Sequence, residues 1–392
     1  MVKLQSQSNL ILAALLIASK CITKKSTLAI FENVLLTHGG KDGDSFVFVG
    51  ASSDSNIITA APVSEVEGKM EKDICLPVSR LIPLLSSLPE CVVTLTVNDD
   101  YTMDVDYCIE LNKEKAKTGH AAMPWLDADY FARLNTDNMD IQTSVVIPAS
   151  TFAEAVTMAT AFAENDDLHP QMSGVCVRVQ SDNELRIEAT NGHKFVRSVL
   201  TREGLLLQGS PKDVILFKPH ARFMPVIGGS GDVTITMYGK DEAVSLVVFE
   251  TENTTIICKN VDGKFPKTDA ILPKDSSYIE VDRKELSDTL KRISLSSGST
   301  KSVILEKNGL TMTLTGNDID YNLSGSEQVM IYDSNCPDCT RVVLAVADFR
   351  EICSVFKEDK IHVKITSPQQ PVTVVRAEGE PDLIALMMPL IL

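Results

Sequence analysis

Three stretches of the chain share one pattern: DICLPVSRLIPLL (residues 73–85), DVILFKPHARFMPVI (213–227) and VVLAVADFREICSVF (342–356). Each begins with a short apolar run, passes a polar or proline-containing turn and continues with apolar residues at helical spacing. An alternating strand pattern follows each stretch, as CVVTLTV, DVTITMY and KIHVKIT. The pattern therefore predicts one strand–helix–strand unit that is repeated three times.

Three further stretches open with the same step from strand to helix: VKLQSQSNLILAALLIA, VVIPASTFAEAVTMATAFA and YIEVDRKELSDTLKRISL. The equivalent landmark positions of the six units lie 63 to 72 residues apart along the chain. These landmarks are Val2, Ile74, Val145, Val214, Ile279 and Val342. Paired units predict an α+β fold of three domains, at residues 1–140, 141–275 and 276–392, in which each unit is a β-α-β-β-β half-repeat.

The helices expected in the fifth and sixth units carry local start signals. Asp282 and Glu285 form a capping box in the fifth unit, and Asp348 is the expected N-cap of the sixth, with Glu351 three residues on. Apolar residues then share one helical face. In the fifth unit they are Leu286, Leu290 and Ile293, and in the sixth they are Phe349, Ile352, Cys353 and Phe356.

Composition places the chain among folded proteins and limits how it can bind nucleic acid. Of its 392 residues, 44% are hydrophobic and 23% are charged, which is typical of chains that bury a core. The formal net charge is −16, whereas affinity for polyphosphate comes from Lys and Arg side chains that neutralise phosphates. Any contact with DNA is therefore expected to be local.

Nine cysteines at scattered positions lack the dense spacing of a secreted disulfide framework, so we expect a reducing cytoplasm. Cys336 and Cys339 form the one short pair, which fits either part of a metal or redox site or two loop cysteines. The apolar run from Leu10 to Ala18 is interpreted as a first helix rather than as a signal peptide. Nothing approaches the roughly 20 apolar residues of a membrane span, so we expect a soluble protein without a membrane partner.

Motifs of common enzyme classes are missing from the sequence. There is no GxxxxGK[ST] phosphate loop, no GxGxxG dinucleotide loop, and no HExxH or GxSxG motif. We therefore expect no catalytic residues, no resident metal and no cofactor. An enzyme that uses His193 or the Cys336–Cys339 pair is kept as a rival of a different class, although no recognised motif sets a serine, cysteine or carboxylate beside His193.

Three strings resemble signature segments of the bacterial DNA polymerase III beta subunit, the sliding clamp that makes the replicative polymerase processive. They are ATNGHKF (residues 189–195), VDGKFPKTDAILP (261–273) and ALMMPLIL (385–392). STLAIFENVLL (26–36) resembles the segment that closes the first helix in that family. The resemblance covers the whole chain in order. It implies a homodimeric ring of two head-to-tail subunits, with helices around the central hole and sheets on the outside.

In that family, short peptides of partner proteins bind in a hydrophobic groove between the second and third domains. The resemblance implies a peptide with a glutamine and a terminal Leu-Phe pair, anchored between adaptable apolar walls. The positions that match the family's groove are Met172, Thr190, Gly192, His193, Lys194, Phe195, Pro266, Ile271, Phe349, Leu386, Met387, Met388, Pro389, Leu390, Ile391 and Leu392. Without the resemblance, ALMMPLIL would be interpreted as a last core strand and TNGHK as a turn.

Three positions depart from the family's groove. Lys194 and Ala270 stand where the family often has arginine, and Phe349 stands where tyrosine is common. These residues keep the walls apolar but remove polar contacts. We therefore expect a shifted preference for partner peptides.

For DNA, the family uses basic residues on the helices that line the hole and on the loop after the first helix. The matching loop residues are Lys24 and Lys25, and the candidates on helices are Lys20, Arg80, Lys218, Arg222, Lys284 and Lys291. The alternative for these side chains is an ordinary solvated helix surface. Ile293 and Leu295 are candidates for the contact between subunits, with burial in the core as their alternative.

The function that the resemblance implies is a non-enzymatic sliding clamp. It would encircle duplex DNA without reading the base sequence and would bind DNA polymerase, clamp-loader subunits and repair proteins through their peptides. The alternative is a clamp-like adaptor that binds peptides but does not encircle DNA. Retention on circular DNA distinguishes the two, because only a closed ring is held there by topology.

Overall fold

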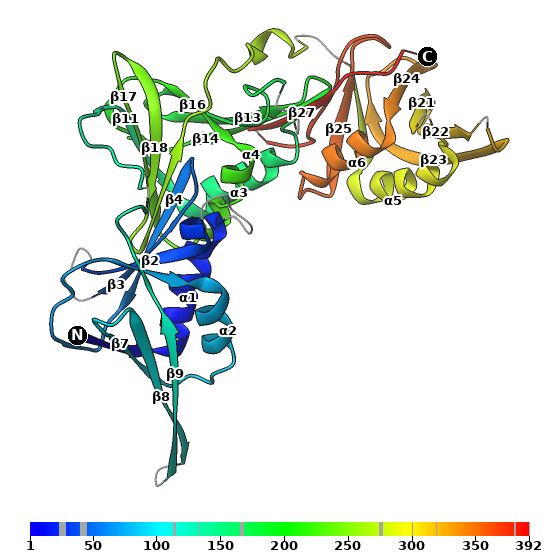
Figure 1. Ribbon diagram of the computed structural model, residues 1–392. Coiled ribbons are helices and arrows are strands. Elements are labelled where there is room, and N and C mark those ends of the chain that lie inside the picture. Colours follow the sequence, from blue (N-terminus) through cyan, green and yellow to red (C-terminus); the bar gives the residue numbers. More distant parts are fainter. Residues whose placement is uncertain are drawn as a thin grey trace. The chain divides into compact units, whose positions relative to one another are not determined.

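The computed structural model describes residues 1–22, 29–39, 45–112, 115–131, 133–164, 168–273, 277–299, 301–318, 320–379 and 382–391 (Figure 1). The chain divides into two compact units. The first unit comprises Met1–Ala153, Leu205–Lys212 and Arg222–Asn260. The second comprises Glu154–Gly204, Asp213–Ala221 and Val261–Leu392. The division into three domains stays a prediction.

The predicted β-α-β-β-β half-repeat is confirmed at all six landmark positions, which lie within the described residues. In each half-repeat a strand runs directly into a helix. The six leading strands are β1 (Val2–Gln7), β6 (Ile74–Pro77), β11 (Asp140–Pro148), β16 (Asp213–Phe217), β20 (Ser277–Asp282) and β24 (Thr340–Ala345). The helices that follow them are α1 (Ser8–Ala18), α2 (Val78–Ser86), α3 (Ala149–Thr160), α4 (Lys218–Ala221), α5 (Arg283–Ile293) and α6 (Val346–Ser354).

Three further strands complete each half-repeat. They are β2 (Asn33–Gly39), β3 (Ser45–Ala51) and β4 (Ser55–Pro62); β7 (Val92–Val97), β8 (Thr102–Asn112) and β9 (Lys115–Pro124); β12 (Gly174–Ser181), β13 (Glu184–Thr190) and β14 (Lys194–Thr201); β17 (Asp232–Lys240), β18 (Ala243–Glu250) and β19 (Thr254–Lys259); β21 (Ser302–Asn308), β22 (Thr311–Asp318) and β23 (Leu323–Ser334); and β25 (Lys360–Ile365), β26 (Val372–Arg376) and β27 (Leu383–Met387). Short elements lie between them. They are β5 (Glu65–Glu67), β10 (Leu126–Asp127), β15 (Leu206–Gly209), and the 3₁₀ turns η1 (Ser19–Cys21), η2 (Ala29–Glu32), η3 (Met224–Ile227), η4 (Thr268–Ala270) and η5 (Ser294–Ser296).

The strands of the described residues form three antiparallel sheets, and each sheet stays within one unit. The first unit holds the sheets β5-β1-β7-β8-β9 and β10-β6-β2-β3-β4-β19-β18-β17-β11-β15. The second unit holds β16-β12-β13-β14-β27-β26-β25-β20-β23-β22-β21-β24. Strands far apart in sequence are joined in both units, because β4 pairs with β19 and β14 pairs with β27.

Local signals explain where α5 and α6 begin. Asp282 is the N-cap of α5, and its carboxylate accepts a hydrogen bond from Glu285 N at 2.7 Å, as predicted. The prediction that Asp348 caps α6 is wrong. The N-cap is Ala345, since β24 runs straight into the helix, and Asp348 lies in the first turn. A carboxylate there still favours the positive end of the helix dipole.

The helices pack their apolar faces against the sheets. The predicted faces of α5 and α6 are confirmed, with Leu286, Leu290, Phe349 and Ile352 fully buried. Each such side chain contributes about 1.5–3 kcal/mol relative to exposure. Leu295, in η5, is instead 78% exposed.

The described residues bear on two further features, membrane-spanning helices and metal sites. No helix among them is long and apolar enough to cross a membrane. Within the same residues, no group of three or more His, Cys, Asp or Glu side chains is arranged to hold a metal ion. Cys336 is buried, Cys339 is exposed, and both are free thiols.

Candidate functional site

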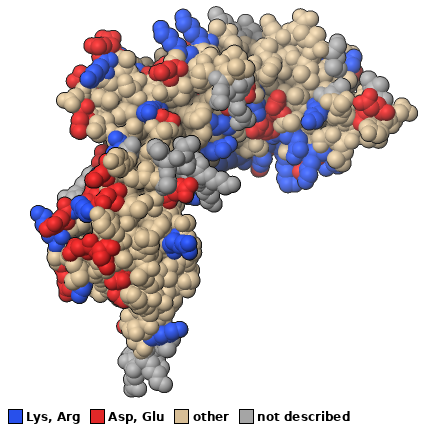
Figure 2. Space-filling model, in the orientation of Figure 1, with Lys and Arg blue, Asp and Glu red and all other residues tan. Residues whose placement is uncertain are grey.

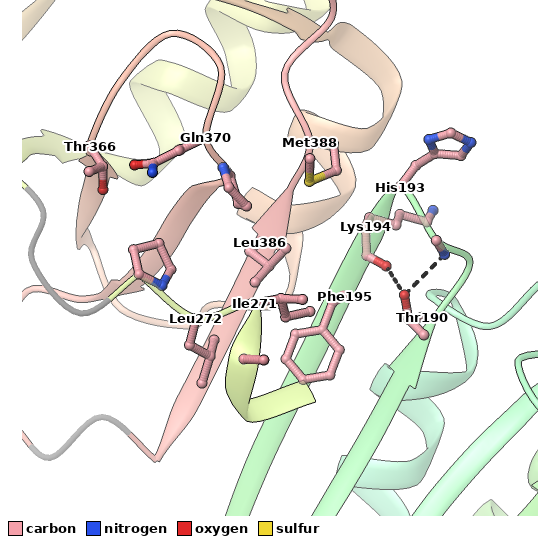
Figure 3. Close-up of a pocket in the computed structure, with 14 residues that line it drawn as sticks. Thr190, His193, Lys194, Phe195, Ile271, Leu272, Thr366, Gln370, Leu386 and Met388 are labelled. Atoms are coloured by element: carbon pink, nitrogen blue, oxygen red, sulfur yellow. Dashed lines mark hydrogen bonds between the residues drawn. The ribbon is translucent and has the colours of Figure 1, made fainter. Parts of the chain in front are cut away.

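A cavity of about 520 Å³ lies in the second unit, and we call it the groove (Figure 3). The start of β14, the end of β27, the segment after η4 and the loop between β25 and β26 surround it. Its lining residues are Thr190, Gly192, His193, Lys194, Phe195, Ala270, Ile271, Leu272, Pro273, Thr366, Gln370, Pro371, Leu386 and Met388. Most are apolar or uncharged, which suits the binding of an apolar ligand with a few polar fixings.

The floor of the groove is a strand pair. Phe195 on β14 lies opposite Leu386 on β27, and Lys194 lies opposite Met387. The pairing continues past β27, because Met388 N donates a hydrogen bond to His193 O at 2.8 Å. Side chains alternate between the two faces of a strand, so Leu386 and Met388 line the groove while Met387 is buried in the core.

A tight turn before β14 is fixed by its own side chains. Thr190 Oγ1 donates to Lys194 O at 2.8 Å and accepts from Gly192 N at 3.1 Å. Asn191 Oδ1 accepts from His193 N at 3.0 Å. Gly192 has φ +85°, a conformation that favours glycine. The turn leaves His193 exposed, and Figure 3 shows its ring pointing away from Phe195 and the other apolar side chains.

The charge of Lys194 is compensated inside the second unit. Its ammonium forms an ion pair with Glu351 and lies 3.5 Å from Asp348 Oδ1, both on α6. It also lies 5.4 Å from the centroid of the Phe162 ring. The side chain is only 9% exposed. Lys194 is the one Lys or Arg among the described lining residues, so these residues offer a bound molecule little net charge.

Half of the groove positions implied by the sequence come together in the structure. Thr190, Gly192, His193, Lys194, Phe195, Ile271, Leu386 and Met388 line the cavity. Met172 and Pro266 are half-buried outside the lining, and Phe349 and Met387 lie in the core. Pro389, Leu390 and Ile391 follow β27 beyond the lining, and Leu392 lies outside the described residues. Peptide binding by these residues stays a prediction.

Six of these lining residues were not among the matched positions, although Ala270 was expected in the groove as a departure from the family's arginine. Ala270, Leu272 and Pro273 lie within the string VDGKFPKTDAILP, so that string already contained the signal for them. Thr366, Gln370 and Pro371 come from the loop between β25 and β26. No local pattern marks this loop, because it reaches the groove only through the folding of β25 to β27 in one sheet.

The basic residues that were predicted to face DNA differ in their exposure to solvent. Lys20, Arg80 and Arg222 are exposed in the first unit, and Lys284 and Lys291 are exposed on α5 in the second. Figure 2 shows Lys and Arg side chains gathered over α5. Lys218 is half-buried, and its ammonium donates to Ala163 O at 2.7 Å. Lys24 and Lys25 lie outside the described residues. A role of these residues in DNA binding stays a prediction.

Comparisons with known proteins agree on one family. Residues 146–267 match the family model described as DNA polymerase III beta subunit, central domain. The beta sliding clamp of Synechocystis is 24% identical over 295 residues, which cover 72% of each chain. That of Rickettsia bellii is 21% identical over 402 residues, which cover 99% of each chain.

Solved structures show the same fold. A sliding clamp from Pseudomonas aeruginosa, solved with griselimycin bound, matches with a TM-score of 0.87 at 18% identity and covers 100% of both chains. The sliding clamp of Bacillus subtilis matches with a TM-score of 0.84 at 18% identity, covering 100% of this chain and 99% of its own.

Proposed function

We infer that this chain, which belongs to the DNA polymerase III beta subunit family, is a DNA sliding clamp that gives the replicative polymerase processivity. In this role it encircles duplex DNA as a homodimer and holds partner proteins by their peptides, without a chemical step of its own. We expect it in the cytoplasm.

The strand pairing within the chain supports a ring of two copies. The last of the three strands that complete each half-repeat are, in chain order, β4, β9, β14, β19, β23 and β27. The end strand of the first half-repeat pairs with that of the fourth, and the third pairs with the sixth. Each half-repeat thus pairs with the one three places further along. Counted on from the fifth half-repeat, three places lead to the second half-repeat of another copy, so β23 would pair with β9 of a second copy.

Both of these strands have an edge available. Strand β9 lies at the end of its sheet, and residues 323–328 of β23 pair on one side only, with β22, among the described residues. An unpaired strand edge is a template for another chain. Two equal β23–β9 contacts would close a head-to-tail ring of two subunits by symmetry.

The assembly is tested by sedimentation equilibrium. A dimer near twice 42.8 kDa at micromolar concentration is the expected result, and a strict monomer contradicts the ring. Encirclement is tested separately by loading the protein with a clamp loader onto nicked circular DNA. We expect retention on the circle and release when the DNA is linearised, whereas an adaptor that does not encircle DNA shows no difference.

The groove supports the tethering of partners. Ile271, Leu272 and Met388 offer apolar contact to the side chains of an extended peptide, and His193 with nearby backbone groups offers polar contact. The proposed ligand is a short segment of a polymerase, loader or repair protein with a glutamine and a terminal Leu-Phe pair. Fluorescence polarisation with such a labelled peptide tests this, and the absence of saturable binding contradicts it.

Weak binding to linear DNA is part of the same proposal. With a net charge of −16, the protein has only local basic surfaces, such as the one over α5, for phosphate. Affinity for a linear duplex should therefore be low and should fall further with salt. Tight sequence-specific binding would contradict sliding.

A further inference from the structure

We propose that Arg197 is a positioning residue for the groove, because it holds the wall segment 270–273 in place together with Glu188 and Thr268. The proposal rests on the proposed function for the nature of the ligand, a partner peptide. Arg197 itself does not line the groove. It would act on the bound peptide through the residues that do.

The wall segment has no sheet to hold it. Four consecutive residues, 270–273, line the groove, yet none belongs to a strand of the described residues. Ile271 N donates to Thr268 O at 3.3 Å, a bond within the turn formed by η4. The position of the wall relative to β14 therefore depends on side chains of the residues just before it.

Those side chains enter a buried charged cluster on β13 and β14. Arg197 Nε donates to Glu188 Oε1 at 2.5 Å, and its Nη2 donates to Thr268 Oγ1 at 2.8 Å. Thr268 Oγ1 in turn donates to Glu188 Oε1 at 2.9 Å. Glu188 is 0% exposed, Thr268 is 1% and Arg197 is 5%. The three groups thus form a closed set of hydrogen bonds away from water.

Arg197 lies between the floor of the groove and the residues that lead into the wall segment. Its Nη2 lies 2.8 Å from Asp269 Oδ1, in the residue next to Ala270. On the other side, its guanidinium carbon lies 5.7 Å from the centroid of the Phe195 ring, which lines the floor. One side chain therefore links the floor to the wall and sets the distance between them.

Energetics favour a role in geometry over one in stability. Burial of charged groups carries a desolvation penalty that offsets much of their attraction, so an apolar cluster of similar size often stabilises a fold equally well. The hydrogen bonds within the cluster do constrain direction and distance. A binding site that already has its bound geometry loses less conformational entropy when the ligand binds, so the ligand binds more tightly.

The experiment compares two arginines of the same sheet in the full-length protein, the buried Arg197 and the half-buried Arg178. Arg197→Met removes the bonds of Arg197 to Glu188, Thr268 and Asp269, while the ion pair between Arg186 and Asp269 stays. Arg178→Met is the matched control, since Arg178 also contacts Glu188, 3.3 Å from its Oε2, but has Asp213 as its second partner in place of Thr268. Affinity for the Leu-Phe-ending peptide is measured by fluorescence polarisation. We expect roughly tenfold weaker binding for Arg197→Met and less than about twofold change for Arg178→Met.

Thr268 provides a conservative rescue. Thr268→Val keeps the size of the side chain but loses the hydroxyl. It should therefore lower the affinity for the peptide to a similar degree as Arg197→Met. Thr268→Ser restores the hydroxyl and should return affinity close to that of the wild type. A role in stability alone would make Thr268→Ser, which loses a buried methyl group, no better than Thr268→Val.

Hydrogen exchange without peptide separates this inference from the proposed function. The amide of Ile271 should exchange faster in Arg197→Met and Thr268→Val than in the wild type and in Arg178→Met. Unchanged exchange of Ile271 in both variants overturns the positioning role, whether or not the wild type binds the peptide. Equal loss of peptide affinity in Arg197→Met and Arg178→Met also overturns it. If the wild type binds no peptide while Ile271 exchange changes as expected, the proposed ligand is wrong and the positioning role stands.

Discussion

Phe195 and Leu386 lie directly opposite each other on the antiparallel strands β14 and β27, and both line the groove. The last strand of the chain is thus built into the floor of the site, and Met388 continues it by a backbone bond to His193. The residues after Met387 are outside the strand. The contribution of Met388 can therefore be tested by a truncation that leaves β27 complete.

Removal of residues 388–392 should weaken peptide binding by about tenfold or more while the fold is kept. Met388 is 41% exposed and lines the groove, so the truncation removes an apolar anchor, and β27 stays complete to Met387. Fluorescence polarisation measures the affinity and circular dichroism checks the fold. Ile391→Ser is the control, because Ile391 is 88% exposed outside the lining. Full affinity after truncation would exclude Met388 from the site.

Phe349→Ala should lower the free energy of unfolding by about 3–5 kcal/mol. Phe349 is a residue of α6 that is completely buried and does not line the groove, so its loss leaves a cavity in the core. Differential scanning calorimetry measures the change. Leu310→Ala, at a side chain that is 70% exposed, should stay within about 0.5 kcal/mol of the wild type. Lost peptide binding at unchanged stability would instead support the groove role implied by the sequence.

Ala122→Pro should weaken the dimer roughly tenfold while β9 keeps its place in the sheet. Trp125 N donates to Tyr101 O at 3.0 Å, and amides alternate in direction along a strand. The amide of Ala122 therefore points to the free edge of β9, where proline is tolerated but cannot donate to a partner strand. Sedimentation velocity over a dilution series measures the dissociation constant. Ala122→Ser keeps the amide and should behave as the wild type; equal dimers from both variants would place the interface elsewhere.

His120, on the same strand, should titrate above pH 6.5. Its Nδ1 lies 2.8 Å from Asp106 Oδ1, and this hydrogen bond raises the pKa of His120. A raised pKa means that the folded state favours the protonated form. The small stabilisation is therefore complete below pH 6.5 and is lost as the pH rises through the folded-state pKa.

An NMR titration of the imidazole measures this pKa. Asp106→Asn should return the midpoint toward 6.5, whereas Asp104→Asn should have a smaller effect, because Asp104 lies 3.8 Å from Nε2. A midpoint at or below 6.5 in the unmodified protein would show that the pair does not persist in solution.

Local patterns in the chain were enough to predict the half-repeats. Strand and helix periods of two and 3.6 residues depend on near neighbours, so each landmark strand and the apolar faces of α5 and α6 could be placed without tertiary information. The N-cap at Asp282 could also be predicted from near neighbours, since it depends only on the spacing to Glu285. Asp348 has equal spacing to Glu351, yet the preceding strand starts α6 earlier.

The groove required more than local pattern. Its signature strings named Phe195, Ile271 and Leu386, but their meeting depends on β14 pairing with β27, which follows from the packing of the whole second unit. The fold of the same sheet brings Gln370 into the lining. Arg197 meets Glu188 within the β13–β14 hairpin, but its bond to Thr268 joins distant segments. Residue types and their periods are properties of short segments, and they determined the elements here. Which side chains share a cavity depends on contacts between distant segments, and these exist only once the sheet has formed.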